Sequence, residues 1–204
     1  MNSKLQRAVV FALILSLMVA TRLNLPTSLT HFGPVPDASW AAFFLGGFYL
    51  RTWTRWAFPV FMALAVLVDY VVISGQGMDF WAHYCMSAAY WFLVPAYFAL
   101  WFGGMLTRRF YKEANGKALG VLVASLFGSV VLCHLLSQGS FYWMSDSVAD
   151  PTFAGWWKNY SDWFVPYLRT TAIYVGLAVI AHVGVVQAAR AQAARLQAQA
   201  KAPR

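Results

Sequence analysis

The residues best able to bind a ligand or a metal lie in one stretch, "DFWAHYCMSAAYW", which spans residues 79–91. It combines a carboxylate, Asp79, with an imidazole, His83, and a thiol, Cys85, inside a mostly apolar segment. A thiolate is a soft ligand that suits transition metals, and an ionisable group within a membrane segment indicates function by default. The stretch therefore predicts ligand or metal binding close to where a helix enters a membrane.

The composition identifies the class of protein that must position these residues. The chain has 204 residues, of which 60% are hydrophobic and only 11% charged. Soluble proteins carry about 25% charged residues, so the sequence predicts an integral membrane protein in contact with the lipid bilayer. The net charge of +8 does not indicate nucleic-acid binding, because the basic residues flank apolar segments and form no single patch.

Apolar segments predict the number of membrane spans. About 20 apolar residues are needed to cross a hydrocarbon core of roughly 30 Å, and six segments meet or approach that length. They are residues 8–25, 38–53, 56–74, 79–105, 117–138 and 163–188. The second is short and is joined to the third by "RTWTR", which we interpret as a tight hairpin. The predicted fold is an all-α bundle of six transmembrane helices.

The basic residues predict the orientation of this bundle. With a cytoplasmic N-terminus, twelve of the fifteen Lys and Arg residues lie inside, and only Arg22, Lys158 and Arg169 lie outside. This positive-inside pattern predicts that both termini of the multi-pass protein are cytoplasmic. We expect residues 1–188 to form the six-helix domain, with a substrate pocket at its outer face, and residues 189–204 to form a cytoplasmic helical tail.

Helical geometry predicts how the residues of the opening stretch are arranged. If the fourth segment is helical from residue 79, Asp79 and His83 share a face, and Tyr90 lies roughly 140° round from Cys85. Cys85 then lies about 9 Å below the outer start of its helix, at a rise of about 1.5 Å per residue. This geometry predicts that Cys85 can be reached from outside the cell.

Other polar groups are predicted at a similar outer depth. Asp69 follows the apolar run "FMALAVLV" with no cation nearby in the sequence, and His31 lies in the connection after the first segment. Cys133 and His134 lie near the outer end of the fifth segment. Because an unpaired ionisable group is costly within a membrane, a pocket open to the outer face explains their positions most simply.

Each cysteine and histidine also has a plain structural interpretation. Cysteine is among the most buried residue types, so residue type alone favours packing roles for Cys85 and Cys133. Their similar depths also permit a disulfide. His182, toward the inner end of the sixth segment, is predicted to be a hydrogen-bonding partner in helix packing.

The arrangement resembles a known class of membrane proteins. Six spans, cytoplasmic termini and the AxxxA pattern of "AVVFA" in the first segment resemble the substrate-binding S-components of energy-coupling-factor transporters. Within that class, the cysteine of "HYCMSAAYW", followed five residues later by tyrosine, resembles the BtuM family of cobalamin transporters. The resemblance implies an S-component-like bundle in a bacterial cytoplasmic (inner) membrane that binds and takes up cobalamin, vitamin B12.

The resemblance also implies roles for particular residues. It implies that Cys85 ligates the cobalt of cobalamin and that bound cyanocobalamin loses its cyanide, which would add a cysteine-mediated decyanation to transport. Asp69, Tyr90 and His31 are the candidate contacts to the corrin amides or to the loop that closes over them. The sequence has no Walker A motif, so either another subunit or a downstream trap must supply the driving force for uptake. The resemblance to S-components implies an energy-coupling-factor transmembrane and ATPase module as the subunit of the first alternative.

Two other classes of function remain open at this point. One is a membrane redox protein that holds haem between His83 and His134, or cycles a disulfide between Cys85 and Cys133. The other is a structural or assembly subunit, whose polar residues pair only with one another.

Overall fold

The computed structural model describes residues 4–23, 35–83 and 85–201, and within these ranges the chain forms helices and connections without a β-strand. The predicted all-α fold is therefore confirmed. In chain order the elements are α1 (Lys4–Arg22), α2 (Ser39–Tyr49), η1 (Arg51–Trp53), α3 (Thr54–Gly75), η2 (Ala88–Phe92), α4 (Leu93–Phe110), α5 (Gly116–Met144) and α6 (Phe153–Lys201), where η denotes a 3-10 helix.

Five helical segments among the described residues are long and apolar enough to cross a membrane. They are Lys4–Arg22, Arg51–Gly75, Ala88–Phe110, Gly116–Met144 and Phe153–Gln199. Their side chains are mostly exposed to the surroundings, and exposed Leu, Val and Phe are common along them. An apolar exterior on long helices is the arrangement of a multi-pass membrane protein.

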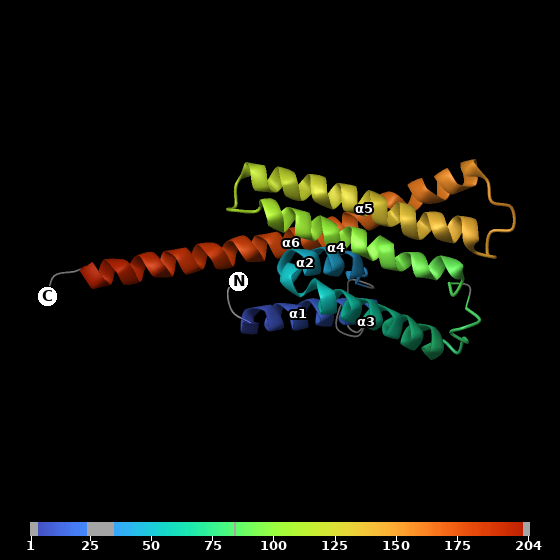
Figure 1. The fold of residues 1–204 in the computed structure, drawn as a ribbon, viewed down its shortest axis with the longest axis horizontal. Coiled ribbons are helices and arrows are strands. Elements are labelled where there is room, and N and C mark those ends of the chain that lie inside the picture. The colour runs from blue at the N-terminus through green and yellow to red at the C-terminus, as the bar shows by residue number, and fades with distance from the viewer. Residues whose placement is uncertain (1–3, 24–34, 84, 202–204) are drawn as a thin grey trace.

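The bundle has two distinct ends (Figure 1). The α4–α5 connection lies at the end from which the C-terminal half of α6 extends. This end carries Arg108 and Arg109 in the last turn of α4, Lys112 in the connection and Lys117 in the first turn of α5, and we call it the basic end. The α3–η2 connection lies at the opposite end, which we call the Asp69 end because α3 brings Asp69 close to it.

The short helix α2 forms the centre of the bundle. Its 11 residues cover about 16 Å, roughly half the thickness of a hydrocarbon core. All residues from Ser39 to Gly47 are buried, which explains why the segment is apolar on every side. The predicted second segment, 38–53, thus contains a short buried helix, and the chain turns at η1 into α3 as "RTWTR" predicted.

Glycine pairs hold α2 against α4 at very close range. A Cβ atom on Gly47 would lie 1.9 Å from the carbonyl oxygen of Trp101, and one on Gly104 would lie 1.9 Å from that of Phe44. No side chain fits at either position, so the two backbones pack directly on each other, as small residues permit in membrane helices. This contact gives the two ends of the bundle a common rigid core.

The fourth segment differs from its prediction. The apolar pattern predicts a helix over 79–105, but the helical residues are Ala88–Phe110, and the described residues 76–83 and 85–87 belong to a connection. Local side-chain hydrogen bonds explain the difference: the Asp79 carboxylate accepts from the backbone N–H of Trp81 (2.9 Å), and the Ser87 hydroxyl caps η2 by accepting from Ala89 N–H (3.3 Å). Such bonds compete with a helix before residue 88.

The connection between α5 and α6 is shorter than predicted. The apolar segments left residues 139–162 outside the membrane, whereas α5 continues to Met144 and α6 begins at Phe153. The α6 helix has 49 residues and is about 73 Å long, so it extends well beyond the rest of the bundle (Figure 1).

Candidate functional site

A hydrogen-bonded charge network lies at the Asp69 end. Asp69, in the last two turns of α3, forms an ion pair with Arg22, the final residue of α1. Its other carboxylate oxygen accepts a hydrogen bond of 2.8 Å from the Tyr90 hydroxyl of η2. The structure therefore brings together two of the sequence-predicted site residues, Asp69 and Tyr90, although they lie 21 positions apart in the chain.

The position of α1 brings Arg22 into this network. The Thr21 hydroxyl accepts a hydrogen bond from the backbone N–H of Ala38 (3.1 Å), which fastens the end of α1 to the start of α2. The side chains of Arg22 and Asp69 are only 16% and 20% exposed. Because both are largely withdrawn from solvent, each needs the other's charge, and removal of one partner leaves a poorly solvated ion.

One donor of Arg22 has no partner among the described residues. Its Nη1 atom is buried and has no hydrogen-bond partner among the described residues. Tyr97, buried on α4, and Asp37 lie within electrostatic range of the guanidinium group. A buried N–H group without a partner is uncommon in proteins, so this donor is available to a carbonyl, amide or phosphate oxygen of a ligand.

Sequence reasoning did not assign Arg22 to the site. Asp69 was judged to have no cation near it in the sequence, and its partner lies 47 positions away. One signal did point to Arg22, because it is one of only three basic residues on the predicted outer side of the membrane. A basic residue on the outer side is an exception to the positive-inside pattern, so we expect a nearby carboxylate to neutralise its charge. Asp69 is that carboxylate for Arg22.

Cys85 lies in the α3–η2 connection and is partly exposed. Its backbone N–H donates a hydrogen bond of 3.3 Å to the Nδ1 atom of His83. The expected depth of about 9 Å within a helix is wrong, because the described residues 79–83 and 85–87 are not helical. For the same reason Asp79 and His83 do not share a helix face, and the predicted angle between Cys85 and Tyr90 does not apply.

The other two predicted contact residues are His31 and Tyr90. His31 lies outside the described residues. Tyr90 belongs to η2, which packs against α5, where the Ser140 hydroxyl donates to the carbonyl oxygen of Ala89 (3.5 Å). The helix α5 therefore supports the element that carries Tyr90.

The pair Cys133 and His134 lies inside the bundle. Both side chains have no exposed surface, and the His134 Nε2 atom donates to the carbonyl oxygen of Tyr160 (2.9 Å). Aromatic rings surround this imidazole at centroid distances of 4.5–6.0 Å; they belong to Trp40, Tyr160, Phe164 and Tyr167. Cys85 and Cys133 are both thiols in the structure, and no disulfide joins them.

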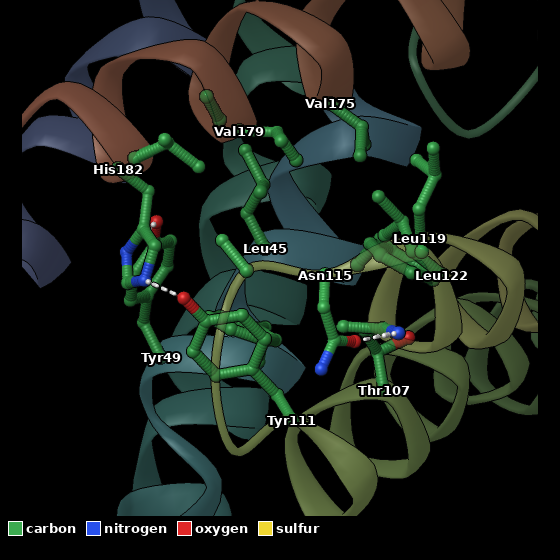
Figure 2. A pocket seen from close by; sticks show the side chains of 17 residues that line it. Leu45, Tyr49, Thr107, Tyr111, Asn115, Leu119, Leu122, Val175, Val179 and His182 are labelled. Atoms are coloured by element: carbon green, nitrogen blue, oxygen red, sulfur yellow. Dashed lines mark hydrogen bonds between the residues drawn. The ribbon is translucent and has the colours of Figure 1, made fainter. Parts of the chain in front are cut away.

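A cavity of about 260 Å³ lies at the basic end, far from Asp69. Its walls come from α2, the α4–α5 connection, the first turns of α5, and α6 (Figure 2). The Tyr49 hydroxyl and His182 Nδ1 are 3.2 Å apart, as are His182 Nε2 and the Tyr111 hydroxyl. The prediction that His182 is a hydrogen-bonding partner in helix packing is confirmed.

The possible metal ligands of this chain are scattered. Among the described residues no group of three or more His, Cys, Asp or Glu side chains could hold a metal ion. A metal that brings most of its own ligands, as in a macrocycle, needs only one donor from the protein. Cys85 is a suitable donor of this kind, because a thiolate binds soft and borderline metals.

No family model and no curated protein matches this chain in sequence.

Proposed function

We propose that this chain is a cobalamin-binding uptake protein in which the Cys85 thiolate ligates the cobalt of the bound corrinoid. Cobalamin is the cargo of the protein. The proposal starts from the BtuM-like motif "HYCMSAAYW" and from the membrane bundle that presents it. It assigns Cys85 as the metal ligand and Asp69, Tyr90 and His31 as contacts to the ring or to the loop that covers it.

The arrangement of Asp69 and Tyr90 is the observation that carries the proposal. These two residues were selected from the motif and from depth in the membrane, and they share a hydrogen bond at the end of the bundle that also carries Cys85. The network includes a buried Arg22 N–H group that has no hydrogen-bond partner in the described part of the chain. A corrin ring is bordered by amide groups, whose carbonyl oxygens accept hydrogen bonds from such donors.

The chemistry needs a single thiolate from the protein. A corrin supplies four nitrogen ligands in its plane, so Cys85 has only to occupy an axial position. With cyanocobalamin, the sulfur–cobalt bond forms, the cobalt–carbon bond breaks, and cyanide leaves with the thiol proton as hydrogen cyanide. Cobalt remains Co(III), because the step exchanges ligands without electron transfer.

The proposal includes the orientation of the protein and a partner. Six spans with both termini in the cytoplasm would place the Asp69 end outside a bacterial cytoplasmic membrane, within residues 1–188. The basic residues at the opposite end support this orientation. Because the sequence contains no Walker A motif, uptake would take its driving force from an energy-coupling-factor module, which hydrolyses ATP, or from a downstream trap for the corrinoid.

Visible absorption of the purified protein tests the function directly. Protein prepared with cyanocobalamin should carry a corrinoid whose spectrum is shifted by the sulfur ligand. Cys85→Ala should lose this shifted spectrum, while Cys133→Ala, which removes a thiol from the buried core, should retain it. An unchanged spectrum in Cys85→Ala would refute the ligand assignment. A haem Soret band that depends on His83 and His134, without corrinoid, would instead identify a redox protein.

A further inference from the structure

The cavity at the basic end has the features of an amphiphile-binding site. Apolar side chains cover most of its surface, and they belong to Leu45, Leu119, Leu122, Val175 and Val179, with the hydroxyl and imidazole groups of Tyr49, Tyr111 and His182 at one side (Figure 2). Ligand sites in proteins commonly combine an apolar surface with a few polar groups placed together. A hydrocarbon chain fits the apolar part of this cavity.

A cation stands beside the polar side of the cavity. The guanidinium carbon of Arg108 lies 5.4 Å from the ring centre of Phe48 and 5.8 Å from that of Tyr111, and both rings line the cavity. Arg108 is partly buried, and within the part of the chain that the structure describes no carboxylate forms an ion pair with it. Arginine binds phosphate groups through several N–H donors in a fixed plane.

The charge around Arg108 also favours an anion. Arg109, Lys112 and Lys117 lie within nine residues of it, and the one carboxylate in this stretch, Glu113, is exposed and accepts a hydrogen bond from Asn115 (3.1 Å). Basic pockets between membrane helices bind the headgroups of anionic lipids. The cavity and the charge therefore point to the same class of ligand.

We propose that the cavity between α2, α5 and α6 binds one anionic phospholipid, with an acyl chain against Leu119, Leu122 and Val179 and the phosphate on Arg108. The lipid comes from the leaflet at the basic end. This site is separate from the proposed corrinoid site. From Leu93 to Thr107 the helix α4 alone covers about 21 Å between the two ends.

Native mass spectrometry of the full chain tests the site. Delipidated protein in detergent is titrated with phosphatidylglycerol or with phosphatidylcholine of identical acyl chains. We expect one molecule of phosphatidylglycerol to bind about fivefold more tightly, which corresponds to one basic residue near an anionic headgroup. Arg108→Gln should abolish this preference. Arg109→Gln is the matched control and should keep the preference, because Arg109 is exposed and its guanidinium group lies over Phe110, a ring that does not line the cavity.

Two further experiments test which part of the lipid the cavity binds. Ala178→Phe should lower the occupancy of both lipids, because Ala178 lines the cavity and the larger ring fills the space for the chain. Glycerol 3-phosphate, the headgroup fragment without acyl chains, should not displace the lipid. Equal binding of the two lipids, an equal loss in Arg108→Gln and Arg109→Gln, or displacement by glycerol 3-phosphate would each overturn the proposal.

Discussion

The two ends of this bundle solve the problem of polar groups in a membrane in different ways. At the Asp69 end, full charges meet: Arg22, Asp69 and the Tyr90 hydroxyl form one network. At the basic end, the neutral groups of Tyr49, His182 and Tyr111 form the network beside a cavity. A charged network in which one Arg22 donor has no partner among residues 4–23, 35–83 and 85–201 suits recognition of polar groups on a ligand. A neutral network beside an apolar cavity suits an acyl chain.

The close contact of α2 with α4 connects the two ends of the bundle, so its loss should lower the free energy of unfolding more than any other change. Gly47→Ala or Gly104→Ala would place a methyl group against a backbone oxygen and should destabilise the protein by about 3 kcal/mol, the upper part of the range for overpacking. Thermal unfolding in detergent measures this loss. Gly120→Ala, on α5 with open space around it, should be neutral or stabilising by up to about 1 kcal/mol. Equal effects at the three positions would contradict direct backbone packing.

The second prediction separates a withdrawn ion pair from an exposed one. Asp69→Ala leaves the Arg22 guanidinium poorly solvated and should cost about 2–3 kcal/mol, below the range for full burial because both side chains retain some exposure. Asp162→Ala breaks the pair with Lys158. The side chain of Asp162 is 53% exposed and that of Lys158 is 77% exposed, so the loss should cost at most about 0.5 kcal/mol. If the two variants had the same unfolding midpoint, the ion pair of Asp69 would not stabilise the protein more than an exposed one does.

The third prediction concerns the hydroxyl of Tyr90. Tyr90→Phe removes one hydrogen bond to a carboxylate, while Arg22 still pairs with Asp69, so the loss in the free energy of unfolding should be about 1.5 kcal/mol. Tyr70→Phe, at an exposed position on α3, should change it by less than about 0.5 kcal/mol. If corrinoid affinity falls in Tyr90→Phe by no more than in Tyr70→Phe, Tyr90 is not part of the ligand site.

The neutral network should show the smallest effects. His182→Phe removes two hydrogen bonds at the basic end and should cost about 1 kcal/mol, because such bonds between membrane helices contribute about 0.6 kcal/mol each. Tyr111→Phe removes one of the two and should cost about half as much. Denaturant titration in mixed micelles can resolve this order. A loss in His182→Phe as large as that in Asp69→Ala would abolish the distinction between the two ends.

Particular residues show what the sequence could predict. The all-α fold and the positions of α1, α3 and α5 follow from apolar length, since hydropathy responds to the same burial in lipid that the helices require. The start of the fourth segment was wrong because residues 79–87 are as apolar as a helix, while Asp79 and Ser87 bind nearby backbone N–H groups. Hydropathy does not register such local competition.

The candidate site was predictable only in part, for a related reason. Asp69 and Tyr90 stood out because a carboxylate in an apolar run and a tyrosine after the cysteine are visible along the chain. Arg22 was missed because its pairing with Asp69 depends on how α1 lies beside α3, which no local pattern encodes. The cavity at the basic end was missed as well, because it arises where α5 and α6 meet α2 in three dimensions.

X-ray absorption at the cobalt K-edge tests the central claim most directly, since it reports the atoms bound to the metal. The wild-type protein loaded with cyanocobalamin should show one sulfur neighbour and no cyanide carbon. Cys85→Ala should lose the sulfur and keep the cyanide, and Cys133→Ala should match the wild type. A cobalt site with no sulfur neighbour in the loaded wild-type protein would contradict the assignment of Cys85 as its ligand.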